Sequence, residues 1–305
     1  MENQVNLKKQ RRRAIFQEQL PSYIMLAPFF IFFIAFLVLP ILSSIVLSFT
    51  NFDMINTPSF EGLGNYLRMF LDDDMFPIVF KNTMIFAIIC GPAGFFLSFV
   101  LAWFINEFSP LVRTILSFMF YAPSLAGNVV LIWSVAFSSD SYGYINSALL
   151  SLGLITEPVT WLSTAKYIKP IVIAVQLWSS MGVSFLSNIS GLQNVNNELY
   201  EAGSIDGIRS RWQELWYITL PTMKHMLLFS AVMQISSAFS ISSIATQLAG
   251  FPSVEYAADT IVSHMQDLGT IRFELGYASA VSVMLFLMMV LFRLIVGKVL
   301  NMTGK

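Results

Sequence analysis

The sequence predicts an all-α integral membrane protein, a bundle of six transmembrane helices with a pair of short helices between the fourth and fifth spans. Of its 305 residues, 56% are hydrophobic, whereas soluble domains use roughly 45–50%. The hydrophobic residues gather in six long runs that contain no acidic or basic side chain. Each run is close to the roughly 20 residues that a helix needs to cross a bilayer. Because lipid cannot satisfy the backbone, we expect these runs to be helices.

The six spans follow one another along the whole chain. The first comes after the basic stretch LKKQRRR, but it is far longer than the roughly 7–15 apolar residues of a signal peptide, so we expect it to be retained. Prolines at positions 28, 40, 92 and 123 are expected to kink the first three spans. The chain thus divides into a basic tail over residues 1–21, a transmembrane domain over 22–300 and a tail over 301–305. The expected spans are Ser22 to Phe49, Asn82 to Ile105, Ile115 to Phe137, Pro170 to Gly191, Met226 to Ala245 and Gly276 to Phe292.

Orientation follows from the distribution of Lys and Arg, because basic residues concentrate in cytoplasmic loops. Twelve of them fall in the two tails and the even-numbered loops, and five fall in the remaining loops. This places both termini in the cytoplasm, together with the loop between the fourth and fifth spans. The five outside residues are Arg68, Lys81, Lys166, Lys169 and Arg272.

The spans lack the ionisable side chains that ion-coupled transporters and pumps usually carry within the bilayer. All eighteen Asp and Glu and both His lie outside the apolar runs. An ion-coupled secondary transporter is therefore disfavoured, although carbonyls and hydroxyls can also bind sodium. Hydrolase, zinc-protease and nucleotide-binding motifs are also absent. The net charge of −1 and the single Cys90 indicate neither nucleic-acid binding nor a metal centre.

One loop is unusually charged for this chain, the segment ELYEAGSIDGIRSRWQ from Glu198 to Gln213. Asn196 and Asn197 are good helix N-caps, Asp206-Gly207 indicates a turn, and Ser210 to Gln213 forms a capping-box pattern. The segment therefore predicts two short helices, the second amphipathic, with Ile208, Trp212, Leu215 and Trp216 on one face. A solvated loop, a helix on lipid headgroups and a helix pair that docks in a groove of a cytoplasmic protein all fit, and the residues rank the last two equally.

The phrase EAGSIDG followed by ITLP resembles the EAA loop of permease subunits of binding-protein-dependent ABC importers. ELY before the motif and RWQ after it resemble the carbohydrate-uptake branch, of the maltose and multiple-sugar type. Weaker phrases in the same order extend the resemblance over roughly residues 22 to 300: GLGNY at 62–66, FKNT at 80–83 and GYIN at 143–146. The motif positions are Glu201, Ala202, Gly203, Gly207, Ile218, Leu220 and Pro221.

The resemblance implies a channel subunit in a bacterial or archaeal plasma membrane, itself not an enzyme. Its partners would be a second permease, expected to be a different homologous chain, two ATPase subunits that bind ATP and Mg, and an extracytoplasmic binding protein that delivers a carbohydrate. No cofactor is expected on this chain. The loop over residues 196–221 would couple to the ATPase. Glu201 would contact it, Gly207 would be the hinge of the turn, and Pro221 would mark the break before span five. The remaining expected coupling residues are Ala202, Gly203, Asp206, Arg209, Arg211 and Leu220.

Three departures from the family pattern concern the coupling loop. Gly203 replaces the second Ala, which costs about 0.5–1 kcal/mol inside a helix and puts the rigidity of the first helix in question. Ile208 stands where a small Ala is common, and Val195-Asn196 where Ile-Pro is common. The glutamate and the turn glycine are both retained, so docking is still expected.

Polar and aromatic residues within spans four and five are candidates for the sugar pathway, because sugar sites combine an aromatic face with hydrogen-bonding groups. The alternative is that they hydrogen-bond helix to helix. An importer of glycerol phosphate or another polyol is the main alternative function, and the absence of Lys and Arg within the spans opposes a phosphorylated substrate. The candidates are Gln176, Trp178, Ser184, Asn188, Gln234 and Phe239.

Overall fold

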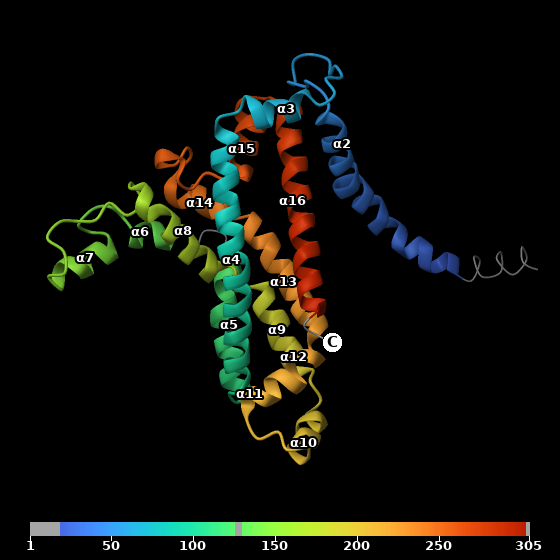
Figure 1. Cartoon of the computed structure of the whole chain (residues 1–305), viewed down its shortest axis with the longest axis vertical. Coiled ribbons are helices and arrows are strands. Elements are labelled where there is room, and N and C mark those ends of the chain that lie inside the picture. The colour runs from blue at the N-terminus through green and yellow to red at the C-terminus, as the bar shows by residue number, and fades with distance from the viewer. Residues whose placement is uncertain (1–18, 126–129, 303–305) are drawn as a thin grey trace, which may run out of the picture.

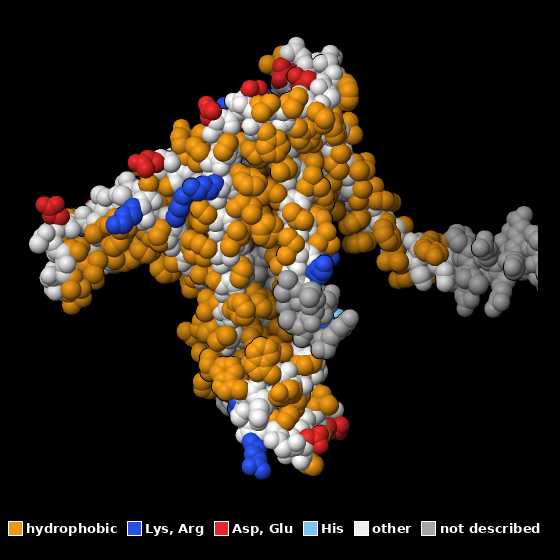
Figure 2. Space-filling model, viewed as in Figure 1, with side chains coloured by type: hydrophobic (Ala, Val, Ile, Leu, Met, Phe, Trp, Pro, Cys, Tyr) orange, Lys and Arg blue, Asp and Glu red, His pale blue; other side chains and the backbone are white. Residues whose placement is uncertain are grey.

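The computed structural model describes residues 19–125 and 130–302, which form helices joined by loops. In this part of the chain the only β-pairing is an isolated bridge between Thr50 and Phe60. The long helices build an elongated bundle, and three shorter helices project to one side of it, namely α6 (Val130–Ala136), α7 (Tyr144–Ser151) and α8 (Ala165–Ser179) (Figure 1). Hydrophobic side chains cover the flanks of the bundle, and acidic side chains gather at its ends (Figure 2). The predicted all-α membrane fold is confirmed, while most of the two tails lies outside the described residues.

Within the described residues, each predicted apolar run is mostly helical. Four helices are long and apolar enough to cross a bilayer: Gln19–Leu47, Met75–Asn106, Lys224–Ala249 and Leu275–Lys298. Two further runs are each broken into a bent pair. The helices α5 (Pro110–Leu125) and α6 (Val130–Ala136) meet at 86°, and α8 (Ala165–Ser179) and α9 (Val183–Gln193) at 41°. The number of spans is six if each bent pair crosses the bilayer once.

The remaining helices complete the chain order. The long fifth run consists of α13 (Lys224–Phe239) and α14 (Ser242–Ala249), and α2 (Leu39–Leu47) ends the first helix. The other elements are α3 (Gly64–Leu71), α4 (Met75–Asn106), α7 (Tyr144–Ser151), α10 (Asn197–Ile205), α11 (Arg211–Glu214), α12 (Leu220–Thr222), η3 (Val254–Tyr256), α15 (Ile261–Gln266), η4 (Asp267–Ile271) and α16 (Leu275–Met302).

A wide, π-helical turn precedes each of two prolines. The turn η1 (Ile34–Val38) precedes Pro40, and η2 (Leu215–Thr219) precedes Pro221. Proline has no N–H for the carbonyl four residues earlier, and the wide turn shifts the pairing so that the preceding N–H reaches back five residues. Pro92, by contrast, lies inside the continuous helix α4.

The centre of the bundle is α4, which runs its full length and packs against α9 and α13, while α13 also packs against α9 and α16. Buried apolar clusters follow these contacts from end to end, for example around Phe86, Phe185 and Phe239. The first helix is different. None of its most apolar window is buried against this chain, and it leaves the bundle at an angle (Figure 1).

Three buried asparagines hold the loops at the α3 end of the bundle and on the projecting arm. Asn65, Asn82 and Asn146 lie in the phrases GLGNY, FKNT and GYIN, and each is at most 5% exposed. Each side-chain amide donates to two or more backbone carbonyls, which meets the requirement that buried loop carbonyls be paired. The acceptors are Ser48 and Thr50 for Asn65, Tyr256 and Asp259 for Asn82, and Ser138, Asp140 and Val159 for Asn146.

Candidate functional site

The charged segment folds as two short capped helices joined at a glycine, as its sequence predicts. The Asn196 side chain accepts a hydrogen bond from the Glu198 N–H (3.1 Å) and starts α10. Gly207 has φ +93°, a conformation that glycine adopts without strain. Ser210 and Gln213 then form a capping box that starts α11. The pair lies at one end of the bundle, away from α3 (Figure 1).

Gly203 faces inward from α10 and is buried. A Cβ atom at this position would lie 2.7 Å from Ile218 Cδ1 and 3.1 Å from Ile208 Cδ1. Two departures from the family pattern are thus in contact, because the larger residue at 208 packs where the smaller residue at 203 leaves room. The missing methyl group therefore has a packing explanation.

The second helix is fastened to the end of α4. Arg211 Nη2 lies 2.9 Å from Glu107 Oε2, and Arg211 Nη1 lies 3.0 Å from Glu214 Oε2. The Glu214 hydrogen bond, followed by the Glu107 charge, raises the pKa of the Arg211 guanidinium. One residue further, the rings of Trp212 and Trp103 are 5.3 Å apart. The sequence did not single out Glu107 or Trp103, although WFINE at the end of a span is a place where such contacts arise.

The predicted coupling residues divide into an outer and an inner group. Gly203 is buried and Leu220 half-buried, whereas the others are exposed. Ile205 joins the exposed group with 86% of its surface accessible, which sequence analysis missed. The expected apolar face of the second helix is divided too, since Leu215 is buried while Trp212 and Trp216 are exposed. The exposed predicted residues are Glu201, Ala202, Asp206, Gly207, Arg209, Arg211 and Pro221.

A polar cleft of about 430 Å³ lies between α10, the end of α4 and the α11–η2 segment. The carboxylates of Glu107, Glu201 and Glu214 line it together with Arg211. Across its floor the Tyr200 hydroxyl lies 2.9 Å from Thr219 Oγ1. The cleft is acidic overall, which suits a basic or hydrogen-bond-donating side chain from a partner.

Four of the candidate pathway residues hydrogen-bond between helices. Gln176 Nε2 donates to Ser237 Oγ (2.9 Å), and Gln234 Nε2 donates to the Ser180 carbonyl (3.0 Å). Ser184 Oγ donates to the Ser230 carbonyl (3.2 Å), and Asn188 Nδ2 to Ser98 Oγ (3.3 Å). All four residues are at most 3% exposed. Their contacts correspond to the alternative that the sequence left open, in which these residues form hydrogen bonds between helices.

The two aromatic candidates lie in different surroundings. Phe239 is 1% exposed and contacts Phe292 with ring centres 5.3 Å apart. Trp178 is half-buried and packs edge-on against Trp133 at 5.3 Å. From Trp133 an aromatic row continues through Phe137, Trp161 and Tyr167. The i, i+4 spacing of Trp133 and Phe137 was the available signal for this row.

Comparison with known proteins connects this architecture to one family and to several transporters. A family model described as binding-protein-dependent transport system inner membrane component matches residues 91–300. The probable ABC transporter permease protein YesP of Bacillus subtilis is 29% identical, covering 94% of this chain and 93% of that protein. The lactose transport system permease protein LacF of Rhizobium radiobacter is 32% identical, covering 69% and 70%. The arabinooligosaccharides transport system permease protein AraP of Bacillus subtilis is 27% identical, covering 93% and 90%.

Two solved structures share the fold. A chain from a bacterial ABC transporter involved in the import of the acidic polysaccharide alginate superimposes with a TM-score of 0.79 at 24% identity, covering 97% of this chain and 100% of that chain. A chain from a bacterial alginate ABC transporter in complex with an alginate pentasaccharide-bound periplasmic protein gives a TM-score of 0.77 at 22% identity, covering 96% and 98%.

Proposed function

The chain belongs to the family of inner membrane components of binding-protein-dependent transport systems, among the sugar ABC importer permeases, and from this premise we propose how it works within an importer. It forms part of the channel with a second, homologous permease. An extracytoplasmic binding protein delivers a carbohydrate, and two cytoplasmic ATPase subunits, which bind ATP and Mg, drive its passage. Both termini and the loop over residues 196–221 face the cytoplasm.

The observation that carries the coupling proposal is the outer face of α10. It presents Glu201, Ile205 and Asp206 to solvent, while Gly203 anchors its inner face. Helices that lie on lipid headgroups are rich in Lys and Arg, and α10 contains none. Acidic groups around an exposed apolar anchor suit a protein groove better than an anionic membrane surface. We therefore assign α10 and α11 to docking in the ATPase, with Glu201 as a polar contact and Ile205 as the apolar one.

Two other parts of the proposal rest on separate observations. The first helix supports pairing with a second permease, because it extends away from its own bundle with an apolar surface that this chain leaves uncovered (Figure 1). Among the candidate pathway residues, Trp178 is the proposed sugar contact, because it is only partly buried, while Gln176, Ser184, Asn188 and Gln234 form hydrogen bonds between helices.

Co-purification and reconstitution test the coupling. The wild-type permease should retain the ATPase, and uptake into proteoliposomes should require ATP and no ion gradient. Glu201→Ala should weaken ATPase retention at least 10-fold, and Gly207→Pro should abolish it, because proline cannot adopt the positive φ of this turn. The matched control is Glu198→Ala, which removes another exposed acid of α10, one that accepts a hydrogen bond from the N-cap Asn196; this variant should retain the ATPase. Normal ATPase retention by Glu201→Ala and Gly207→Pro would contradict the proposal.

A further inference from the structure

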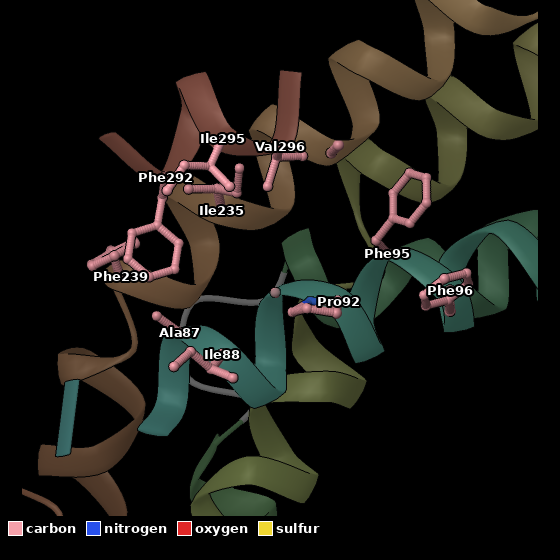
Figure 3. A pocket seen from close by; sticks show the side chains of 12 residues that line it. Ala87, Ile88, Pro92, Phe95, Phe96, Ile235, Phe239, Phe292, Ile295 and Val296 are labelled. Atoms are coloured by element: carbon pink, nitrogen blue, oxygen red, sulfur yellow. The ribbon is translucent and has the colours of Figure 1, made fainter. Parts of the chain in front are cut away.

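An apolar cavity of about 390 Å³ lies between α4, α13 and α16 (Figure 3). Every residue that lines it is apolar, including Ile88 and Phe96 from α4, Ile235 and Phe239 from α13 and Ile295 from α16. The cavity lies within three helices that are long enough to span a membrane. It is separate from the cleft beside α10 and from the polar contacts of α8 and α9.

The cavity opens at the side of the bundle. At its rim Ile88 is 57%, Phe96 62% and Ile295 52% exposed, while Ala231 and Phe239 on its inner wall are buried. Its volume falls within the roughly 300–1,000 Å³ of small-molecule pockets. Apolar cavities of this kind do not hold water, and an empty one forfeits the dispersion contacts of its lining. At this depth in a bilayer the abundant apolar material is the acyl chain of a lipid.

A basic residue lies on α13 beyond the residues that line the cavity. Lys224 is the first residue of α13 and lies two helical turns, about 10.5 Å, before Ala231. Because seven residues make almost two whole turns, Lys224 shares the helical face of Ala231 and Ile235, which line the cavity. Lys224 is half-buried, and within the described residues it forms no ion pair. The antiparallel α16 brings Lys298 to the same end of the bundle.

We propose that this cavity binds an acyl chain of an anionic phospholipid whose phosphate group is held by Lys224. Basic positions between transmembrane helices at one membrane surface are a recurrent setting for anionic headgroups. The long lysine side chain can extend along apolar surface towards a headgroup. The inference requires only that the chain spans a membrane, and it does not depend on the proposed coupling to an ATPase.

Thermal unfolding of the purified full-length importer in detergent tests the site. Dioleoyl phosphatidylglycerol should raise the Tm by several degrees, and dioleoyl phosphatidylcholine should raise it less. Ala231→Phe fills the cavity from α13 and should remove the response to both lipids. Ile295→Trp obstructs the exposed rim and should do the same, which keeps the test decisive if the first variant does not fold. Lys224→Glu should make phosphatidylglycerol binding at least 5-fold weaker while the phosphatidylcholine response remains.

The control is Phe229→Trp, a 48%-exposed position on α13 that does not line the cavity. It should respond to both lipids like the wild type. Wild-type responses from Ala231→Phe and Ile295→Trp would overturn the proposal. An equal Tm rise with inorganic phosphate alone would overturn it in favour of a simple anion site. If Ala231→Phe instead separates the two permeases in size-exclusion chromatography, the cavity holds the partner permease and the lipid assignment is wrong.

Discussion

Gly203 shows how one missing methyl group is matched by its neighbours. A glycine inside a helix costs about 0.5–1 kcal/mol relative to alanine, so its presence in the core of the motif suggests a loose helix. The structure places it against the Cδ1 atoms of Ile218 and Ile208, so that the Ile218 side chain must move to admit a Cβ atom. Overpacking of this kind typically costs 1–3 kcal/mol, which exceeds the helix propensity that alanine would gain.

Substitution of Gly203 by Ala should therefore lower the Tm of the purified permease rather than raise it. Ile218→Val removes the Cδ1 atom that lies 2.7 Å from the new Cβ position, and it should reduce the penalty of Gly203→Ala by about 1 kcal/mol in a double-mutant cycle. The control pair is Gly203→Ala with Ile261→Val, a fully buried isoleucine of another cluster, for which the two effects should simply add. Additivity in both pairs would show that Gly203 has no packing role.

The clamp between α11 and α4 acts at the scale of elements. It consists of the Arg211–Glu107 ion pair and the Trp212–Trp103 contact. Both charged side chains are well exposed, at 65% and 44%, and such pairs contribute about 0–1 kcal/mol. Their importance is therefore geometric, because they join the segment proposed to bind the ATPase to the helix at the centre of the bundle.

If the proposed coupling is correct, Arg211→Glu should lower the amount of sugar transported per ATP hydrolysed several-fold while the ATPase stays bound. The exchange of charges in Arg211→Glu with Glu107→Arg should restore the ratio. Arg209→Glu makes the same charge change at an exposed residue whose side chain has no ion pair in the described part of the chain, and Glu107→Arg should not rescue it. A swapped pair that stays uncoupled would show that the clamp does not transmit motion.

At the scale of the whole molecule, the carboxylate of Asp73 connects three helices at the α3 end of the bundle. Asp73 Oδ2 accepts a hydrogen bond from the Tyr277 hydroxyl and lies 2.8 Å from His264 Nε2. Its other oxygen accepts the N–H groups of Met75 and Phe76. Burial acts to raise the pKa of Asp73, but the hydrogen bonds from Tyr277 and His264 outweigh it and lower the pKa below its ordinary value. This single side chain joins α4 to α15 and α16.

The stability of the bundle should consequently depend on pH. A carboxylate with a lowered pKa stabilises the fold above its unfolded value of about 3.9, and that contribution is lost as the pH falls through the lower folded value. Asp73→Asn should lower the Tm at pH 7, and the difference from wild type should shrink as the pH drops below about 4. Asp72→Asn, an exposed neighbour, should leave the Tm unchanged at each pH. A difference that persists undiminished in acid would show that the carboxylate charge is not responsible.

Much of this architecture follows from local chemistry and could be predicted from the sequence by itself. The length of the apolar runs locates the transmembrane helices, because the thickness of the bilayer sets the length that a spanning helix needs. The Asn196 cap, the Gly207 turn and the Ser210–Gln213 box define the paired helices because their hydrogen bonds and dihedral angles involve residues close in sequence. The 41° bend between α8 and α9 was not predicted, because the apolar run continues through it without a charged residue.

Other features depend on which faces of distant helices meet, and only the tertiary structure decided them. Arg211 pairs with Glu107 across 104 residues, and Asn82 reaches a loop more than 170 residues away. Gln176 and Gln234 are suitable for a sugar by composition, yet both form hydrogen bonds between α13 and the α8 segment, to Ser237 and to the Ser180 carbonyl. The cavity above Lys224 arises where three helices fail to fill the space between them. Sequence spacing along one helix specifies which side chains share a face, but it does not specify the helix that the face contacts.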